Sequence, residues 1–164
     1  MGNGNVNHII CAVRGQPESR ETVTKAIDLA LENDARLTFC LVIEAEFMAQ
    51  SAPTFTPLRA AYRQLEDMGE FSMLILCDRA ERRGVENVEY LIRKGNIPEQ
   101  LRKLAKEVQA ELMVMGRPVR GMAGSVFTPA EFDSFVKKLE QEIGIEIIQV
   151  MHELKASRTE KRRK

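Results

Sequence analysis

Three glycines lie close together in the stretch VMGRPVRGMAGSVFTPAEF, which runs from Val114 to Phe132. Gly116, Gly121 and Gly124 allow the backbone to approach a ligand closely. The two arginines of this stretch have the planar donor geometry that suits phosphate oxygens. Backbone N–H groups that converge on one anion beside a helix N-terminus form a common type of phosphate site. The first chemistry that the stretch indicates is therefore the binding of a phosphate-bearing ligand.

Two other residues of the stretch count against a complete phosphate cradle. Pro118 removes one N–H donor from the loop. Thr128, followed three residues later by Glu131, forms a capping box that predicts the start of the last helix. The Thr128 hydroxyl would accept a hydrogen bond from that helix N-terminus, so part of its donor capacity would already be used. The sequence thus predicts fewer available donors than a triphosphate site needs.

Apolar runs of strand length alternate with segments of helical periodicity, and these elements must position the glycine-rich loop. Helices are predicted between successive strands, and such alternation indicates a parallel sheet with helices on both faces. The predicted fold is therefore an α/β three-layer sandwich with five parallel strands. The predicted strands cover residues 8–13, 36–45, 85–93, 111–116 and 145–151.

Residues 58–83 allow two interpretations. The run FSMLILC, residues 71–77, has the composition of a short strand, but charged residues on both sides and the lack of turn signals favour one long helix. We expect the apolar residues of this helix, Leu65 and Met68 among them, to be buried in the core. Contact with a partner is the alternative.

The composition is that of a single globular domain. The chain has 164 residues, of which 44% are apolar and 29% charged, which is enough for one core. Its net charge is zero, yet the last twelve residues contain six basic and only two acidic residues. We expect a folded domain over residues 8–152, a disordered N-terminus over residues 1–7 and a basic disordered tail over residues 153–164.

The remaining features exclude several classes of function. The mildly acidic body is not that of a nucleic-acid-binding domain, and contact of the tail with RNA, an acidic protein or an anionic membrane is the alternative to a solvated end. No run of apolar residues is long enough for a membrane span, and the start resembles no secretion signal. Three widely separated cysteines favour a reducing cytoplasm.

Catalytic patterns are missing from the sequence. It has no G-x-S-x-G motif and no paired carboxylates after a predicted strand. Its two histidines, His8 and His152, lie near the ends of predicted strands, where we expect them to be solvated. We therefore predict a protein that is not an enzyme and has no metal site.

Three stretches, in this order and spacing, resemble the universal stress protein family. HIICAVRGQPES is similar to the first strand and turn of the family, and DARLTFCLVIEA to its second strand. IRKGNIPEQLRKLAKEVQAELMVMGRP resembles the third strand, the following helix and the fourth strand. The resemblance covers roughly Asn7 to Met151 and implies the strand order 3-2-1-4-5.

In such a sheet, ligands bind beyond the carboxyl ends of the strands, here between the first and fourth strands. The resemblance implies ATP or AMP as a candidate ligand, with main-chain groups near Val42 holding the adenine and the glycine-rich loop surrounding the phosphates. The candidate ligand-binding residues are Val13, Arg14, Gly15, Val42, Met115, Gly116, Arg117, Arg120, Gly121, Gly124 and Ser125.

The chain departs from the family pattern at two points. Arg14 stands where ATP-binding members have an acidic residue, and seven residues separate Gly116 from Gly124 where the family motif has twelve. Two interpretations remain open. Arg14 binds an anion together with Arg117 and Arg120, or Arg14 fills the crevice while the glycines only turn the chain.

The last predicted strand has an apolar edge, and an uncovered edge of this kind favours pairing with another strand. The resemblance implies a homodimer formed through this strand around a two-fold axis. The candidate interface residues are Ile145, Ile147, Ile148 and Val150.

Overall fold

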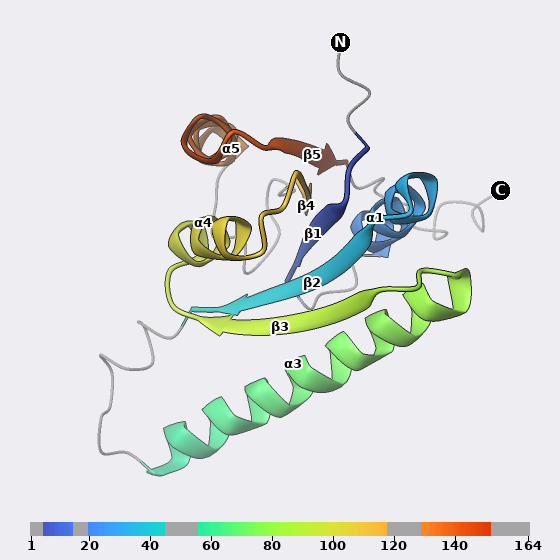
Figure 1. Cartoon of the computed structure of the whole chain (residues 1–164). Helices are drawn as coiled ribbons and strands as arrows, with labels where there is room; N and C mark the ends of the chain where they lie inside the picture. Colours follow the sequence, from blue (N-terminus) through green and yellow to red (C-terminus); the bar gives the residue numbers. More distant parts are fainter. Residues whose placement is uncertain (1–4, 15–19, 45–55, 118–128, 152–164) are drawn as a thin grey trace, which may run out of the picture.

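Five parallel strands form one sheet of order β3-β2-β1-β4-β5, as Figure 1 shows for the computed structural model of the chain. The structure describes residues 5–14, 20–44, 56–117 and 129–151. The predicted strand order and fold class are confirmed. The strands are β1 (His8–Val13), β2 (Arg36–Ile43), β3 (Val88–Lys94), β4 (Leu112–Gly116) and β5 (Glu146–Val150).

The described helices cover both faces of the sheet, which gives the predicted three layers. Helices α1 (Arg20–Asn33) and α3 (Thr56–Arg83) pack on one face, and α4 (Ile97–Glu107) and α5 (Pro129–Ile143) on the other (Figure 1). Alternate residues of the central strand β1 serve the two cores, since side chains of a strand point to opposite faces. Ile9 belongs to the α1 and α3 core and Ile10 to the α4 and α5 core.

Residues 56–83 form a single helix, as the sequence favoured, but its apolar residues are not all in the core. Leu65 is 49% exposed, Met68 62% and Phe71 67%, so the expectation that they are buried is wrong. The helix runs alongside β3, contacts β3 and β2, and buries a narrow stripe that includes Met73 and Ala80 (Figure 1). In the described part of the chain, the opposite side of the helix stays exposed, with Leu74 and Ile75 also about half exposed.

Gly69 lies where α3 packs closely against the sheet. A Cβ atom at this position would come within 2.8 Å of Cδ2 of Leu41, whose side chain is itself buried. The glycine therefore allows the helix to pack directly on β2 and β3.

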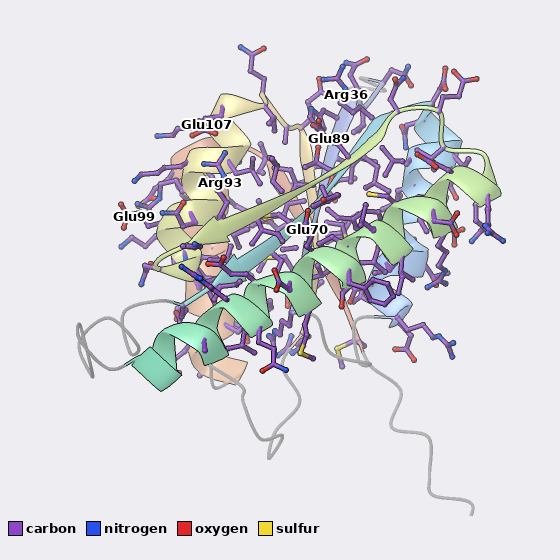
Figure 2. The ribbon with its side chains drawn as sticks, turned by 90° about the horizontal axis from the view of Figure 1, so that it is seen from below. Arg36, Glu70, Glu89, Arg93, Glu99 and Glu107 are labelled. Atoms are coloured by element: carbon purple, nitrogen blue, oxygen red, sulfur yellow. The ribbon has the colours of Figure 1, made fainter. Side chains whose placement is uncertain are left out.

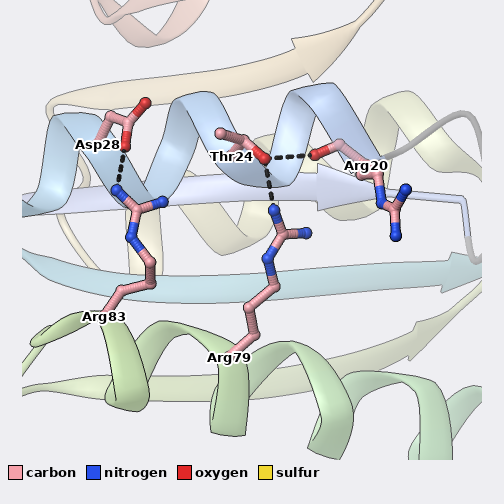
Figure 3. A network of polar contacts seen from close by, with 5 residues as sticks. All are labelled: Arg20, Thr24, Asp28, Arg79 and Arg83. Atoms are coloured by element: carbon pink, nitrogen blue, oxygen red, sulfur yellow. Dashed lines mark hydrogen bonds and ion pairs between the residues drawn. The ribbon is translucent and has the colours of Figure 1, made fainter.

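Polar contacts hold the C-terminal part of α3 against α1. The Arg79 guanidinium donates to Oγ1 of Thr24 at 2.6 Å, and Arg83 forms an ion pair with Asp28 at 2.7 Å (Figure 3). Thr24 also donates to the backbone oxygen of Arg20 at 3.0 Å. These contacts connect the two helices that cover the same face.

Element boundaries differ from the sequence prediction mainly before β3. The predicted strand began at Val85, but the Val85 N–H instead donates to the Ala80 carbonyl oxygen at 3.1 Å and closes the end of α3. Gly84, with φ of +107°, adopts the left-handed conformation that this helix end requires. β3 consequently begins at Val88.

Two predicted helix ends are confirmed. Asn96 is the N-cap of α4, and its Oδ1 atom accepts a hydrogen bond from the Glu99 N–H at 3.2 Å. Gly144, with φ of +73°, ends α5. The predicted cap of α5 at Thr128 lies outside the described residues.

The described N-terminal residues contact the rest of the domain. Val6 packs against the core on the α1 and α3 face. The Asn7 backbone N–H donates to the Glu111 carboxylate, and the Asn7 carbonyl accepts from the Arg36 N–H at 2.9 Å. Among the helices of the described part of the chain, none is sufficiently long and apolar to cross a membrane.

Candidate functional site

β1 and β4 lie side by side, and the chain continues from them to opposite faces of the sheet. The register pairs Ile9 with Leu112 and Ala12 with Met115. β1 is followed by α1 on one face, and β4 by α5 on the other. This arrangement is a topological switch point, where the diverging connections of parallel α/β sheets leave a crevice at the carboxyl ends of the strands.

The described candidate residues gather around this switch point. Val13 ends β1, Gly116 ends β4, and Val42 lies near the end of β2. Their side chains do not share one face, since Val13 packs in the α1 and α3 core while Val42 and Met115 pack in the α4 and α5 core. The other candidates, Gly15, Arg120, Gly121, Gly124 and Ser125, lie outside the described residues.

Arg14 and Arg117 follow the two central strands but differ in their surroundings. Arg14 is exposed directly after β1. The Arg117 guanidinium contacts Oδ2 of Asp133 on α5 at 3.3 Å and donates to Oε1 of Gln149 on β5, also at 3.3 Å. Its backbone N–H donates to the Val150 carbonyl oxygen at 2.9 Å. Arg117 therefore connects β4, α5 and β5.

The partners of Arg117 were not identified from the sequence. Asp133 lies 16 residues after Arg117 and Gln149 lies 32 residues after it. No local spacing rule joins positions that far apart, and only the packing of α5 beside β5 brings them to one guanidinium group. Two acidic residues, Glu131 and Asp133, lie early in the helix after the glycine-rich loop, and the sequence gives no sign of which one Arg117 contacts.

β5 combines buried and half-buried apolar residues. Ile145 and Ile147 are buried against the α4 and α5 core, while Ile148 and Val150 are half-buried on the α1 side. An open groove of about 620 Å³ lies beside them, bordered by residues 148–151 and by α1 residues between Arg20 and Asp28. All four candidate interface residues thus lie on or next to the last strand, and two of them border this groove.

A second polar cluster lies at the opposite, amino end of the sheet. His8 Nε2 is 2.7 Å from Oγ1 of Thr38, and the Thr38 hydroxyl donates to Oε1 of Glu89 at 3.0 Å. His8 is only 7% exposed, so the expectation that it is solvated is wrong. Burial, assisted by the positive charge of Arg36, lowers the pKa of His8.

The three cysteines are free thiols, of which Cys11 and Cys40 are buried and Cys77 is half-buried. Burial raises the pKa of Cys40 to about 12 and that of Cys77 to about 11, and it raises the pKa of Cys11 further. A thiol with a raised pKa is a poor nucleophile at neutral pH. Within the described ranges, no group of three or more His, Cys, Asp or Glu side chains is arranged to hold a metal ion.

Comparison with known families identifies the chain. The model of the universal stress protein family matches residues 5–129, and the chain therefore belongs to this family. No curated protein matches the chain significantly in sequence.

Solved structures share the fold at low sequence identity. A universal stress protein family member from Burkholderia pseudomallei is 18% identical and has a TM-score of 0.66, with 91% of this chain and 98% of that one covered. A universal stress protein in complex with cAMP is 19% identical, with a TM-score of 0.60 and coverage of 92% and 100%. One from Archaeoglobus fulgidus in complex with dAMP is 13% identical, with a TM-score of 0.58 and coverage of 88% and 98%.

Proposed function

We propose that this protein is a non-enzymatic regulatory module that binds an adenine nucleotide or another phosphate-bearing ligand between the ends of β1 and β4. The observation that carries the proposal is the direct pairing of these strands, with α1 and α5 on opposite faces. Two proteins of the same fold, in complexes with cAMP and dAMP, support an adenine nucleotide as the ligand class.

In this proposal Arg14 supplies positive charge at the mouth of the crevice, directly after the buried end of β1. The backbone near Val42 borders the adenine, and the glycine-rich loop contacts the phosphate. ATP and AMP are both candidate ligands.

We place the protein in the cytoplasm because its three cysteines are free thiols, which is typical of proteins in reducing compartments.

Thermal unfolding in the presence of ATP, AMP and inorganic phosphate tests the binding site. A ligand that binds only the native state raises the unfolding temperature. At a ligand concentration of 100 times the dissociation constant, it adds about 2.7 kcal/mol to the free energy of unfolding. Arg14→Asp should reduce this shift, whereas Arg82→Asp, on the exposed side of α3 near its C-terminal end, should leave it unchanged. An unchanged melting temperature with all three compounds would reject the proposal.

The contacts of Arg117 favour a second candidate function. Its guanidinium group already lies against Asp133 and Gln149, so it contributes less positive charge to the crevice than the sequence indicated. The alternative is a dimeric interaction module in which the crevice binds no nucleotide. Dimer formation together with no thermal shift in any nucleotide would select this alternative.

We further propose that two copies pair through the outer edge of β5, around a two-fold axis. The half-buried Ile148 and Val150 support this interface, since pairing would remove apolar surface from water. Sedimentation at micromolar concentration should show a dimer. A single monomeric species over this range would contradict the pairing.

A further inference from the structure

Neighbouring residues of β5 direct their backbone groups to opposite sides of the strand. The Arg117 N–H donates to the Val150 carbonyl oxygen at 2.9 Å, so the backbone groups of Val150 face β4. Because this direction alternates along a strand, Ile148 also faces β4, whereas Ile147 and Gln149 face away from it. β5 is the last strand of the sheet. The N–H and C=O groups of Ile147 and Gln149 therefore lie at the outer edge.

A side chain of α5 forms a hydrogen bond with one of these edge groups. The Ile147 N–H donates to Oε1 of Glu140 at 3.1 Å. Glu140 lies in the last turn of α5, and Gly144, with its positive φ, returns the chain toward β5. The carboxylate thereby reaches back to the strand that follows its own helix. A hydrogen bond to an ionised acceptor is shorter and stronger than one between neutral groups.

We propose that Glu140 closes the outer edge of β5 and that a second copy of the chain must displace its carboxylate before the two β5 strands can pair. The inference rests on the proposed homodimer. An antiparallel pair centred on residues 147–149 requires the Ile147 N–H to donate to a carbonyl oxygen of the partner strand. One N–H cannot serve both acceptors fully, so Glu140 and the partner strand compete for it.

The surroundings of the edge suit a second copy as the competitor. Ile148 and Val150 are only half-buried, and the open groove lies directly beside them. A two-fold pair of β5 strands would bring these residues of both copies together and cover them. The carboxylate opposes this association by holding the donor on which the strand pairing depends.

Sedimentation equilibrium of the full chain measures the competition. Glu140→Ala removes the competing acceptor, and we expect the dimer dissociation constant to fall by about 10-fold. Glu140→Gln keeps an acceptor oxygen without the charge. Its dimer dissociation constant should lie between those of Glu140→Ala and the unsubstituted chain. Glu142→Ala removes a carboxylate from the same helix end, where it pairs with Arg102 of α4, and should leave the dissociation constant unchanged.

Amide hydrogen exchange of the dilute, monomeric chain gives a second measurement. The Ile147 amide should exchange on the order of 10-fold faster in Glu140→Ala, because it loses its acceptor. Equal dissociation constants for the unsubstituted chain and Glu140→Ala, or equal exchange rates, would overturn the role of Glu140 while leaving the dimer intact. Monomers in both proteins at every concentration would instead reject the homodimer itself, and the inference with it.

Discussion

The strands β3 and β5 form the two edges of the sheet, and helices secure them in different ways. On β3, Arg93 pairs with Glu107 of α4, and Lys94 pairs with Glu66 of α3. Figure 2 shows the Arg93 and Glu107 side chains lying close to each other beside β3. Helices on both faces thus hold charged side chains of this edge strand.

The edge formed by β5 carries much less charge. Four of the six residues from Ile145 to Val150 are isoleucine or valine, and the Glu140 carboxylate contacts the outer Ile147 N–H. Charged side chains on an edge discourage pairing with a second sheet, whereas an apolar edge favours it. The comparison shows that the two edges of the sheet differ in how strongly their side chains favour pairing with another strand. Charge disfavours pairing at β3, and the apolar β5 is the edge through which we propose that two copies pair.

The largest expected difference between the edges concerns their apolar residues. Ile147→Ala should lower the free energy of unfolding by about 3 kcal/mol, because Ile147 is only 6% exposed. Ile92→Ala should cost about 1 kcal/mol, because Ile92 is half-buried on β3. Urea unfolding at a concentration that keeps the chain monomeric measures both values. Equal losses would show that the two edges are buried alike.

A second substitution tests how closely α3 covers β2 and β3. Gly69→Val would place a branched side chain against Leu41 and should destabilise the fold by about 2 kcal/mol. Gln64→Val introduces the same side chain at an exposed position of α3 and should cost only a few tenths of a kcal/mol. If both variants unfold at the same urea concentration, the close approach at Gly69 is not a property of the protein in solution.

The third prediction concerns pH and the polar chain that reaches β3 through Glu89. Burial first, and then Arg36, lowers the pKa of His8, an effect that Glu89 and Glu111 partly oppose. The unfolded chain therefore binds the His8 proton more readily than the native one, and stability must fall as pH decreases below about 6.5. Urea unfolding at pH 7.5 and 5.5 measures this loss, which should be smaller in His8→Gln. Identical losses in both proteins would exclude His8 as the cause.

The smallest effect is expected at the charged edge. The Arg93 and Glu107 side chains are partly exposed, and ion pairs of this kind contribute little to stability. A double-mutant cycle of Arg93→Gln and Glu107→Gln should give a coupling free energy that urea unfolding can barely resolve at 0.15 M salt. At low salt the coupling free energy should be larger. A large, salt-independent coupling would show that this pair stabilises β3 directly.

Local patterns in the sequence predicted most of the fold. Alternating strand and helix periods indicated the three layers, and the Asn96 and Gly144 signals placed one end each of α4 and α5 correctly. The prediction failed at Val85, because a valine suits a strand and also suits the buried turn after a helix. It failed at Leu65 and Met68 because helical periodicity shows that a face is apolar but not what covers it.

The candidate site was predictable only in its position. The neighbouring ends of β1 and β4 followed from the resemblance to the family, and the register confirms them. The electrostatics did not follow, since the sequence places Arg117 at a candidate anion site but does not indicate its contacts with Asp133 and Gln149. Charge at a position can be read from a sequence, whereas the partner of that charge depends on how separate elements pack.

By itself, the sequence determined the type and order of the elements of this protein, because backbone preferences and hydrophobic periods act over a few neighbouring residues. Only the tertiary structure decided that Glu140 meets the Ile147 N–H, that His8 reaches Glu89 through Thr38, and that Gly69 brings α3 against Leu41. The physical reason is that each of these contacts joins side chains or backbone groups from different elements. Their distance is set by the packing of helices on the sheet.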